Sequence, residues 1–234
     1  MTTLLDAYAA VAGKDVIDHL RQLAASLKGA RVVHVNSTRS GGGVAEILTK
    51  LVPLKRELGL DARWEVITGD GDFYQCTKAF HNGLQGNRVE LPARLLAAFE
   101  QTNARNAETL RPILADADFV FIHDPQPAPL LRYIPQRRGK WLWRCHIDVS
   151  HPHRPVWRYL RDFVGGYDAS IFSLADFAQP LPHPVYLVPP SIDPLSEKNV
   201  ELDDAEIDAV RSHHHLDPAR PLMLQVSRFD RFKD

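Results

Sequence analysis

The sequence has few cysteines, almost no net charge and no long hydrophobic run. Its 234 residues include only two cysteines, Cys76 and Cys145, which are far apart and match no C-x-x-C metal or redox spacing. We therefore expect reduced thiols, no metal site and a cytoplasmic protein. The net charge of −1 predicts no nucleic-acid partner and no polybasic membrane surface.

Targeting segments and common catalytic motifs are missing as well. No apolar run approaches the roughly 20 residues that span a bilayer, so we expect no membrane partner. Residues 1–29 lack the basic start, apolar core and cleavage site of a signal peptide. No G-x-S-x-G elbow occurs, which argues against a hydrolase. Cys145 and His146 are neighbours on an expected strand and so point to opposite faces, which argues against a thiol nucleophile. No cofactor is expected.

Apolar runs of strand length alternate with segments of helical period along most of the chain. Val16, Leu20, Leu23 and Leu27 form the first helical stripe. Further helices are expected over residues 44–58, 92–112, 154–163 and 203–214. Strands are expected over residues 31–36, 62–68, 119–124, 141–146, 169–172 and 185–188. Residues 69–90 show no clear period and predict a long loop that carries aromatic residues. The alternation predicts an α/β fold with a doubly wound, mainly parallel, Rossmann-like sheet.

Three consecutive glycines, Gly41, Gly42 and Gly43, lie where the first strand turns into a helix. Without Cβ atoms such a turn can adopt positive φ and let a ligand approach the backbone closely. Its N–H groups and the positive end of the helix favour an anion, most often a phosphate. The spacing is not the G-x-G-x-x-G dinucleotide fingerprint. The alternative is a tight turn that binds nothing.

Polar side chains follow the carboxyl ends of two later strands. His123 and Asp124 end one strand, while Arg144 and His146 share one face of the next, and Asp148 follows shortly after. Ligands of open α/β sheets bind beyond these strand ends, and a buried arginine is costly unless it is paired or faces a ligand. The pattern predicts a polar binding site. The alternatives are an aspartate that only closes a turn and a structural histidine.

The carboxyl-terminal part of the sequence has a different organisation. A proline-rich connector over residues 189–203 precedes one polar helix, and residues 222–227 predict a strand whose neighbours are missing. We expect a first domain at 1–216 and the start of a second at 217–234. Arg228 and Lys233 follow that strand. They are two surface charges if taken alone, or a cationic clamp in a two-domain phosphate enzyme. The three histidines at 213–215 cannot face one ion from a helix and indicate a solvated helix end.

From about residue 33 to the end, the sequence resembles the amino-terminal half of the trehalose glycosyltransferring synthases. These are retaining GT-B glycosyltransferases that join glucose from a nucleotide-glucose to free glucose. Trehalose phosphorylases, which use inorganic phosphate, share much of the pattern. The similar segments are GGGVAEIL at 41–48, FHNGLQGN at 80–87, HDPQP at 123–127, WLWRCHID at 141–148 and PPSIDPLSEKN at 189–199.

The resemblance implies a role for each matched residue. The turn formed by Gly41, Gly42 and Gly43 would approach the donor diphosphate and the transferred glucose. His146 would contact that glucose as the catalytic residue. Asp124 and Arg144 would line the acceptor pocket. The chain would thus hold the acceptor side of the reaction.

A second, carboxyl-terminal Rossmann domain with the nucleotide pocket is also implied. Arg228 and Lys233 would neutralise the leaving diphosphate, as transfer without a metal requires. The implied partners are a nucleotide-glucose donor, a glucose acceptor, and that second domain or a second copy in a homodimer. We expect the isolated chain to be inactive. Two alternatives stay open, a trehalose phosphorylase and a non-catalytic sugar-binding or assembly fragment, and the sequence does not specify the donor nucleotide.

Overall fold

A computed structural model describes residues 3–226 of the chain. Its centre is a six-stranded sheet in the order β2-β1-β3-β4-β5-β6, and every neighbouring pair of strands is parallel. The expected α/β fold with a doubly wound parallel sheet is confirmed. The strands are β1 (Arg31–Asn36), β2 (Asp61–Val66), β3 (Phe119–His123), β4 (Lys140–Arg144), β5 (Ala169–Phe172) and β6 (Val185–Leu187).

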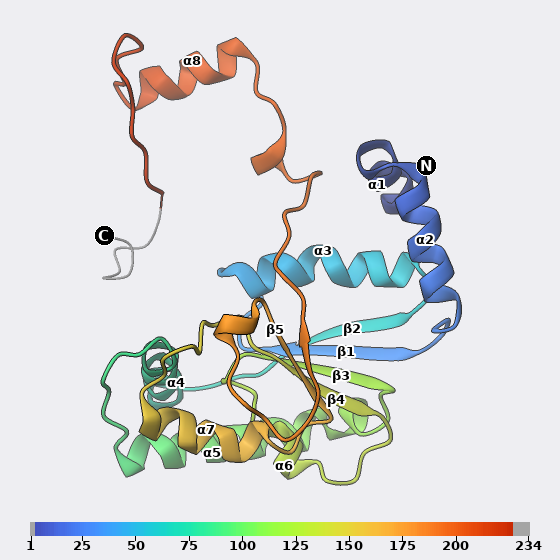
Figure 1. The fold of residues 1–234 in the computed structure, drawn as a ribbon, viewed down its shortest axis with the longest axis vertical. Coiled ribbons are helices and arrows are strands. Elements are labelled where there is room, and N and C mark those ends of the chain that lie inside the picture. The colour runs from blue at the N-terminus through green and yellow to red at the C-terminus, as the bar shows by residue number, and fades with distance from the viewer. Residues whose placement is uncertain (1–2, 227–234) are drawn as a thin grey trace. The chain divides into compact units, whose positions relative to one another are not determined.

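Helices lie on both faces of the sheet (Figure 1). Helix α3 packs over β1 and β2 on one face, and α4, α5, α6 and α7 lie on the other. The α-helices are α1 (Leu4–Ala12), α2 (Lys14–Ala25), α3 (Gly43–Glu57), α4 (Gly71–Leu84), α5 (Ala93–Leu114), α6 (Leu130–Tyr133), α7 (Arg154–Val164) and α8 (Asp204–His213). Short 3₁₀ turns are η1 (Ala175–Phe177) and η2 (Glu197–Asn199). No helix within residues 3–226 combines the length and apolarity that crossing a bilayer requires.

The main hydrophobic core lies between the sheet and helices α4, α5 and α7. Trp141 and Trp143 of β4 are fully buried there, and the Phe80 and Phe99 rings meet edge to face with centroids 4.9 Å apart. A smaller cluster under α3 joins Leu48 and Val52 to strand β2. The layered burial explains why the central strands are almost continuously apolar.

The expected loop over residues 69–90 is wrong, because most of it is helix α4. Asp70 caps this helix by accepting a hydrogen bond from the Phe73 N–H at 2.9 Å. Phe73, Cys76 and Phe80 then recur at helical spacing and are fully buried. The signal was present in the sequence, but polar residues between these positions obscured it.

The expected amino-terminal stripe is also wrong in its orientation. Helix α2 forms, but Val16, Leu23 and Leu27 are exposed, whereas its buried residues are Ile17 and Ala24. Helix α1, which no expectation included, precedes it and begins with a capping box at Thr3. Small residues next to larger apolar ones concealed which face of α2 is buried.

The chain divides into two compact units, one up to Asp193 and one from Pro194 onward. In the second unit α8 forms as expected, and its terminal histidines are exposed. The strand expected at 222–227 is absent from residues 222–226, where Met223 is entirely exposed. A strand needs a paired neighbour, and no described strand pairs with this segment. The proposed boundary at 216 stays a prediction.

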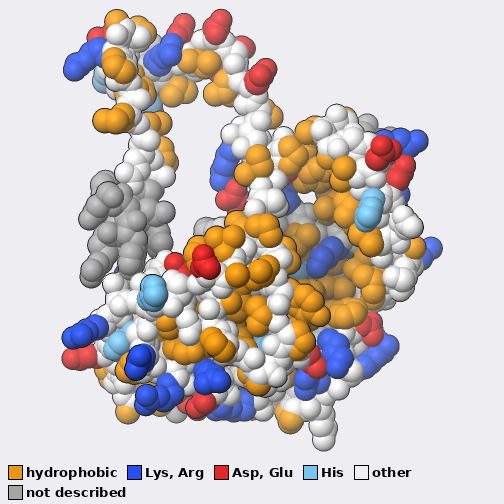
Figure 2. All heavy atoms as spheres, in the orientation of Figure 1, with side chains coloured by type: hydrophobic (Ala, Val, Ile, Leu, Met, Phe, Trp, Pro, Cys, Tyr) orange, Lys and Arg blue, Asp and Glu red, His pale blue; other side chains and the backbone are white. Residues whose placement is uncertain are grey.

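Strand β6 forms one edge of the sheet and is apolar on the outside. Val185, Tyr186 and Leu187 are all exposed, and Figure 2 shows hydrophobic side chains gathered over the middle of the view, where Figure 1 places β5. Exposed apolar surface of this kind favours association. Self-association, or a covering domain, therefore stays a prediction.

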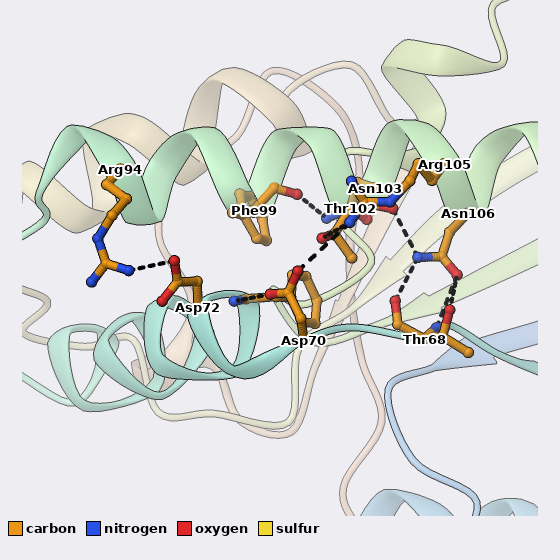
Figure 3. A network of polar contacts seen from close by, with 10 residues as sticks. Thr68, Asp70, Asp72, Arg94, Phe99, Thr102, Asn103, Arg105 and Asn106 are labelled. Atoms are coloured by element: carbon orange, nitrogen blue, oxygen red, sulfur yellow. Dashed lines mark hydrogen bonds and ion pairs between the residues drawn. The ribbon is translucent and has the colours of Figure 1, made fainter.

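Helix α5 is tied to the end of β2 by buried amides (Figure 3). The Asn106 side chain donates to the Thr68 carbonyl at 2.7 Å and accepts from the Thr68 N–H at 2.9 Å. Asn103, one turn earlier, donates to the Phe99 and Gln126 carbonyls at 3.0 Å each. These amides fix loops to a helix through backbone groups.

Candidate functional site

The strand order reverses between β1 and β3, and the predicted site residues follow the carboxyl ends of strands β1, β3 and β4. From β1 the chain runs through α3 to β2 on one side, then returns through α4 and α5 to β3 on the other. Ligands of open α/β sheets bind beyond the carboxyl ends of the strands at this switch point. The glycine turn follows β1, Asp124 follows β3, and His146 follows β4.

The glycine turn is exposed, and two of its residues have backbone angles that favour glycine. Gly41 and Gly42 have φ values of 75° and 84°, in the left-handed region that other residues avoid. Gly42 immediately precedes α3, and Gly43 is its first residue. A Cβ atom on any of the three would meet nothing within 4 Å. Backbone conformation, not crowding, requires glycine at positions 41 and 42, and the space beside the turn is open to a ligand.

Asn36, the last residue of β1, braces the segment that leads into this turn. Its side chain donates to the Thr38 carbonyl at 2.8 Å and accepts from the Trp64 indole N–H at 2.8 Å. The Arg39 guanidinium carbon lies 4.4 Å from the centre of the Trp64 ring, which is a cation–π distance. Strand β2 therefore holds the start of the turn in place.

Asp124 adopts a left-handed conformation with φ of 62°, which costs a non-glycine residue about 1–2 kcal/mol. Three hydrogen bonds maintain it. Its N–H donates to the Arg144 carbonyl at 2.9 Å, its carbonyl accepts from the Trp143 indole at 3.0 Å, and its Oδ1 accepts from the His146 N–H at 2.8 Å. Asp124 thereby joins the loop after β3 to the loop after β4.

The Asp124 carboxyl is also electrostatically unusual. Burial raises its pKa to about 6, against the opposing effects of the His146 N–H and the Arg144 charge. The carboxylate is ionised at pH 7, but it takes up a proton in mildly acidic solution. Such a shifted carboxyl at a strand end is typical of a functional site.

His146 lies beyond the end of β4, partly exposed, with one ring nitrogen already engaged. Its Nε2 is 2.9 Å from His123 Nδ1. Burial, and next the charge of Arg144, lower the pKa of His146 to about 4. The ring is therefore neutral at pH 7, so one nitrogen carries a proton and the other a lone pair.

A line of side chains continues inward from His146. His123 Nε2 lies 2.9 Å from His34 Nδ1, and His34 Nε2 lies 2.9 Å from Lys55 Nζ. Burial lowers the pKa of both inner histidines well below the usual range. Burial also lowers the pKa of Lys55 to about 8, while its ammonium lies 4.6 Å from the centre of the Phe121 ring.

Arg144 uses its guanidinium on the protein itself. Nη1 donates to the Phe172 carbonyl at 3.1 Å and Nη2 to the Val188 carbonyl at 2.6 Å, so it holds the ends of β5 and β6. Asp148 is similarly engaged, because its Oδ1 accepts from the Ser150 N–H at 2.8 Å in a local turn. Sugar contacts by these two residues stay predictions.

Other candidate chemistry is weak or lies outside the described residues. Cys145 is completely buried, and burial raises the pKa of its thiol well above the usual range, so it is a poor nucleophile. Within residues 3–226, no group of three or more His, Cys, Asp or Glu side chains is placed to hold a metal ion. Arg228 and Lys233, expected at the donor diphosphate, lie outside the described residues.

Sequence reasoning missed His34, Lys55 and Asn36 as parts of this region. His34 and Asn36 are two positions apart, so they share one face of a strand that is mostly apolar. A polar residue inside a buried strand is costly unless it is hydrogen-bonded, and that cost was the available signal. Nothing in the local pattern of α3 points to Lys55, because its contact with β1 depends on how the helix packs.

A family model and related sequences both indicate the family of this chain. A family model described as trehalose synthase, N-terminal domain, matches residues 34–179. A trehalose synthase from Thermococcus litoralis is 46% identical over 232 residues, which cover 98% of this chain and 56% of that protein. A trehalose phosphorylase from Pleurotus pulmonarius is 28% identical over 245 residues, covering 91% of this chain and 32% of the relative.

Solved structures agree on the fold. A trehalose-6-phosphate synthase structure superimposes with a TM-score of 0.57 at 16% identity, covering 79% of this chain and 55% of that chain. Its likeness supports the amino-terminal fold of a GT-B glycosyltransferase. The chain spans about half the length of the trehalose synthase that it matches. Because the family model covers more than half of the residues, the chain belongs to the trehalose synthase N-terminal domain family.

Proposed function

We propose that this chain is the acceptor-side half of a retaining glucosyltransferase that makes trehalose from a nucleotide-glucose donor and glucose. The observation that carries the proposal is the hydrogen bond from the His146 N–H to the buried Asp124 carboxylate, beyond the same end of the sheet as the open glycine turn. Membership of the trehalose synthase family supplies the substrate class.

The geometry supports a distinct role for each group. The N–H groups of Gly42 and Gly43 lie at the amino end of α3, where the positive helix end favours a donor phosphate. His146 carries one N–H that can bond a hydroxyl of the transferred glucose. Asp124, ionised at pH 7, can accept from an acceptor hydroxyl. Arg144 is a further acceptor-side residue, and Asp148 a further substrate-binding residue.

We further propose that the isolated chain transfers no glucose. Departure of the diphosphate requires positive groups. We expect these to be Arg228 and Lys233, together with groups in the part of the relatives that this chain does not match. Losing one preorganised contact to developing charge typically slows a reaction by about 10²–10³-fold. Losing several should leave no measurable rate. We place the protein in the cytoplasm, consistent with its two free, buried cysteines.

Two alternatives stay open. The similarity to a trehalose phosphorylase from Pleurotus pulmonarius favours a reaction between trehalose and inorganic phosphate. The second alternative is a non-catalytic sugar-binding or assembly fragment. The site described above is compatible with all three, since each requires a glucose contact at the sheet end.

A hybrid enzyme tests the proposal. Residues 1–234 are joined to the portion of the Thermococcus litoralis trehalose synthase beyond its matched segment, and the hybrid is compared with the unjoined chain. We expect trehalose from nucleotide-glucose plus glucose in the hybrid and none from the chain alone. Turnover only with trehalose and phosphate would assign a phosphorylase. Sugar binding by a soluble hybrid without turnover of either kind would leave the binding module, and turnover by the short chain would refute the division of the site.

A further inference from the structure

We propose that Lys55, His34 and His123 are positioning residues that fix the proton of His146 on Nδ1. The four side chains form one line from helix α3, across β1 and β3, to the loop after β4. Successive nitrogens along it are each 2.9 Å apart, which is the usual length of an N–H hydrogen bond.

The line can run in two directions when its rings are neutral. A neutral imidazole has one N–H and one lone pair, so each ring donates to one neighbour and accepts from the other. His34 and His123 are both deeply buried, with 2% and 4% of their surface exposed. Reversing one ring therefore leaves a buried pair of facing lone pairs or facing protons, which carries the desolvation penalty of an unsatisfied hydrogen-bonding group. The three rings must reverse together.

Lys55 decides which direction is adopted. A charged ammonium has three donors and no acceptor, so it must donate to His34 Nε2. His34 then donates from Nδ1 to His123 Nε2, and His123 donates from Nδ1 to His146 Nε2. The lone pair of Nε2 on His146 is thereby occupied, and the proton of His146 sits on Nδ1. That nitrogen is the one left for a ligand, and it offers a donor.

The neighbouring ionisable groups do not compete between pH 7 and pH 9. Arg144 from β4 faces His123 and His146 and keeps its charge. Asp124, after β3, has a pKa of about 6 and is already ionised. The Cys145 thiol, whose pKa burial raises well above the usual range, stays neutral. Among these described groups, only Lys55, with its pKa of about 8, changes charge in this interval.

Loss of the Lys55 charge would release the direction. One proton leaves to solvent from His146 Nδ1, and His123 passes its Nδ1 proton to His146 Nε2. His34 passes its Nδ1 proton to His123 Nε2, and Lys55 passes a proton to His34 Nε2 and becomes a neutral amine that accepts from it. The net change is one proton. The same side of His146 would then present a lone pair instead of a donor to the ligand.

The use of this donor on a sugar hydroxyl rests on the proposed function, but the position of the proton does not. The test is therefore ¹⁵N–¹H NMR of the imidazole nitrogens in the histidine-labelled 234-residue chain, with His146 assigned from a His146→Gln variant. Protonated and bare ring nitrogens have well-separated ¹⁵N shifts. At pH 7 we expect a protonated Nδ1 and a bare Nε2 in His34, His123 and His146.

Two perturbations should release the direction. In Lys55→Met, which keeps an apolar stem, the two ¹⁵N shifts of His146 should move toward each other at pH 7, as the two directions interconvert. Raising the pH of the unmodified chain through about 8 should produce the same movement without any substitution. Lys55→Arg should restore the pH 7 pattern. Lys50→Met removes an exposed charge from the same helix and should change nothing.

A bare Nδ1 on His146 at pH 7 would overturn the inference, as would unchanged His146 shifts in both Lys55→Met and the pH titration. Equal changes in Lys50→Met would show a nonspecific charge effect and would also refute it. An inactive hybrid enzyme with the expected NMR pattern would refute the proposed function and leave this inference standing.

Discussion

Two sets of buried polar side chains hold this fold together, and they are built differently. The α5 amides Asn103 and Asn106 bond backbone groups almost exclusively (Figure 3). His34, His123 and His146 bond one another, ring to ring. The Asn106 amide has one arrangement that satisfies both its oxygen and its nitrogen, whereas a line of neutral imidazoles has two. The amides fix loops in place, whereas the histidine line can transmit a change in the charge of Lys55 to the partly exposed His146.

The largest effect should come from the outer end of the histidine line. In the hybrid enzyme, His146→Ala should lower kcat by about 10²–10³-fold, roughly 3–4 kcal/mol, because a preorganised contact to the reacting sugar is lost. Affinity for the nucleotide should change little. Steady-state kinetics measures both, and the exposed His151→Ala on the same loop serves as the control. Wild-type turnover in His146→Ala would remove that residue from the site.

A substitution in the amide set should lower the stability of the fold without changing the histidine line. Asn106→Ala leaves the Thr68 N–H and carbonyl without their partner, and should lower the free energy of unfolding by about 2–3 kcal/mol. Urea denaturation measures this loss, and Thr109→Ala, exposed on the next turn of α5, is the control. The ¹⁵N shifts of His146 should not move. A changed His146 pattern would contradict the separation of the two sets.

Asp124 links the site to pH-dependent stability. Its folded-state pKa of about 6 lies above the ordinary value of 3.8. The protonated carboxyl therefore stabilises the fold below about pH 4, and this stabilisation is lost as the pH rises through about 6. His146, whose pKa is lowered to about 4, contributes in the opposite sense, because its stabilisation is lost as the pH falls through 4.

Asp124→Asn isolates the carboxylate from this opposing effect. Asparagine tolerates the left-handed conformation but does not titrate. The stability difference between variant and wild type should therefore change by about 2 kcal/mol between pH 4 and pH 7, discounted for the exposed part of the residue, with the variant gaining relative to wild type as the pH rises. Thermal unfolding across this range measures it. A pH-independent difference would show that the carboxyl is unperturbed.

The smallest expected effect is at the glycine turn. Gly42→Ala and Gly13→Ala both place a side chain at positive φ in open space, and each should cost about 1–2 kcal/mol of stability. Only Gly42→Ala should raise the KM for the donor in the hybrid enzyme, because only that turn faces the proposed phosphate. Equal KM values in the two variants would make the turn purely structural.

Much of the sheet could be predicted because its signals are local. Residues 31–36 and 119–123 are apolar runs of strand length, and Gly41 to Gly43 follow the first of them after four residues. Asp124 and His146 stood out as polar residues at strand ends. Their convergence could be expected, since parallel strands bring their carboxyl ends to one edge.

The rest depended on contacts that the local pattern does not contain. The bond between His34 and His123 requires β1 and β3 to be neighbours, although three helices and a strand separate them in the chain. Lys55 reaches His34 only through the packing of α3. The buried face of α2 was predicted wrongly, and no strand forms over the described residues 222–226. Both have a related cause, because burial and strand pairing depend on partners and not on the segment itself.

Sugar binding at His146 is the claim that most needs a direct measurement. The histidine-labelled 234-residue chain is titrated with glucose and with trehalose, and the imidazole ¹⁵N–¹H signals are followed. We predict saturable shifts of the His146 signals, absent from the exposed histidines 213–215 at the end of α8. Unchanged His146 signals at saturating sugar, or equal shifts throughout all histidines, would contradict a sugar site at this end of the sheet.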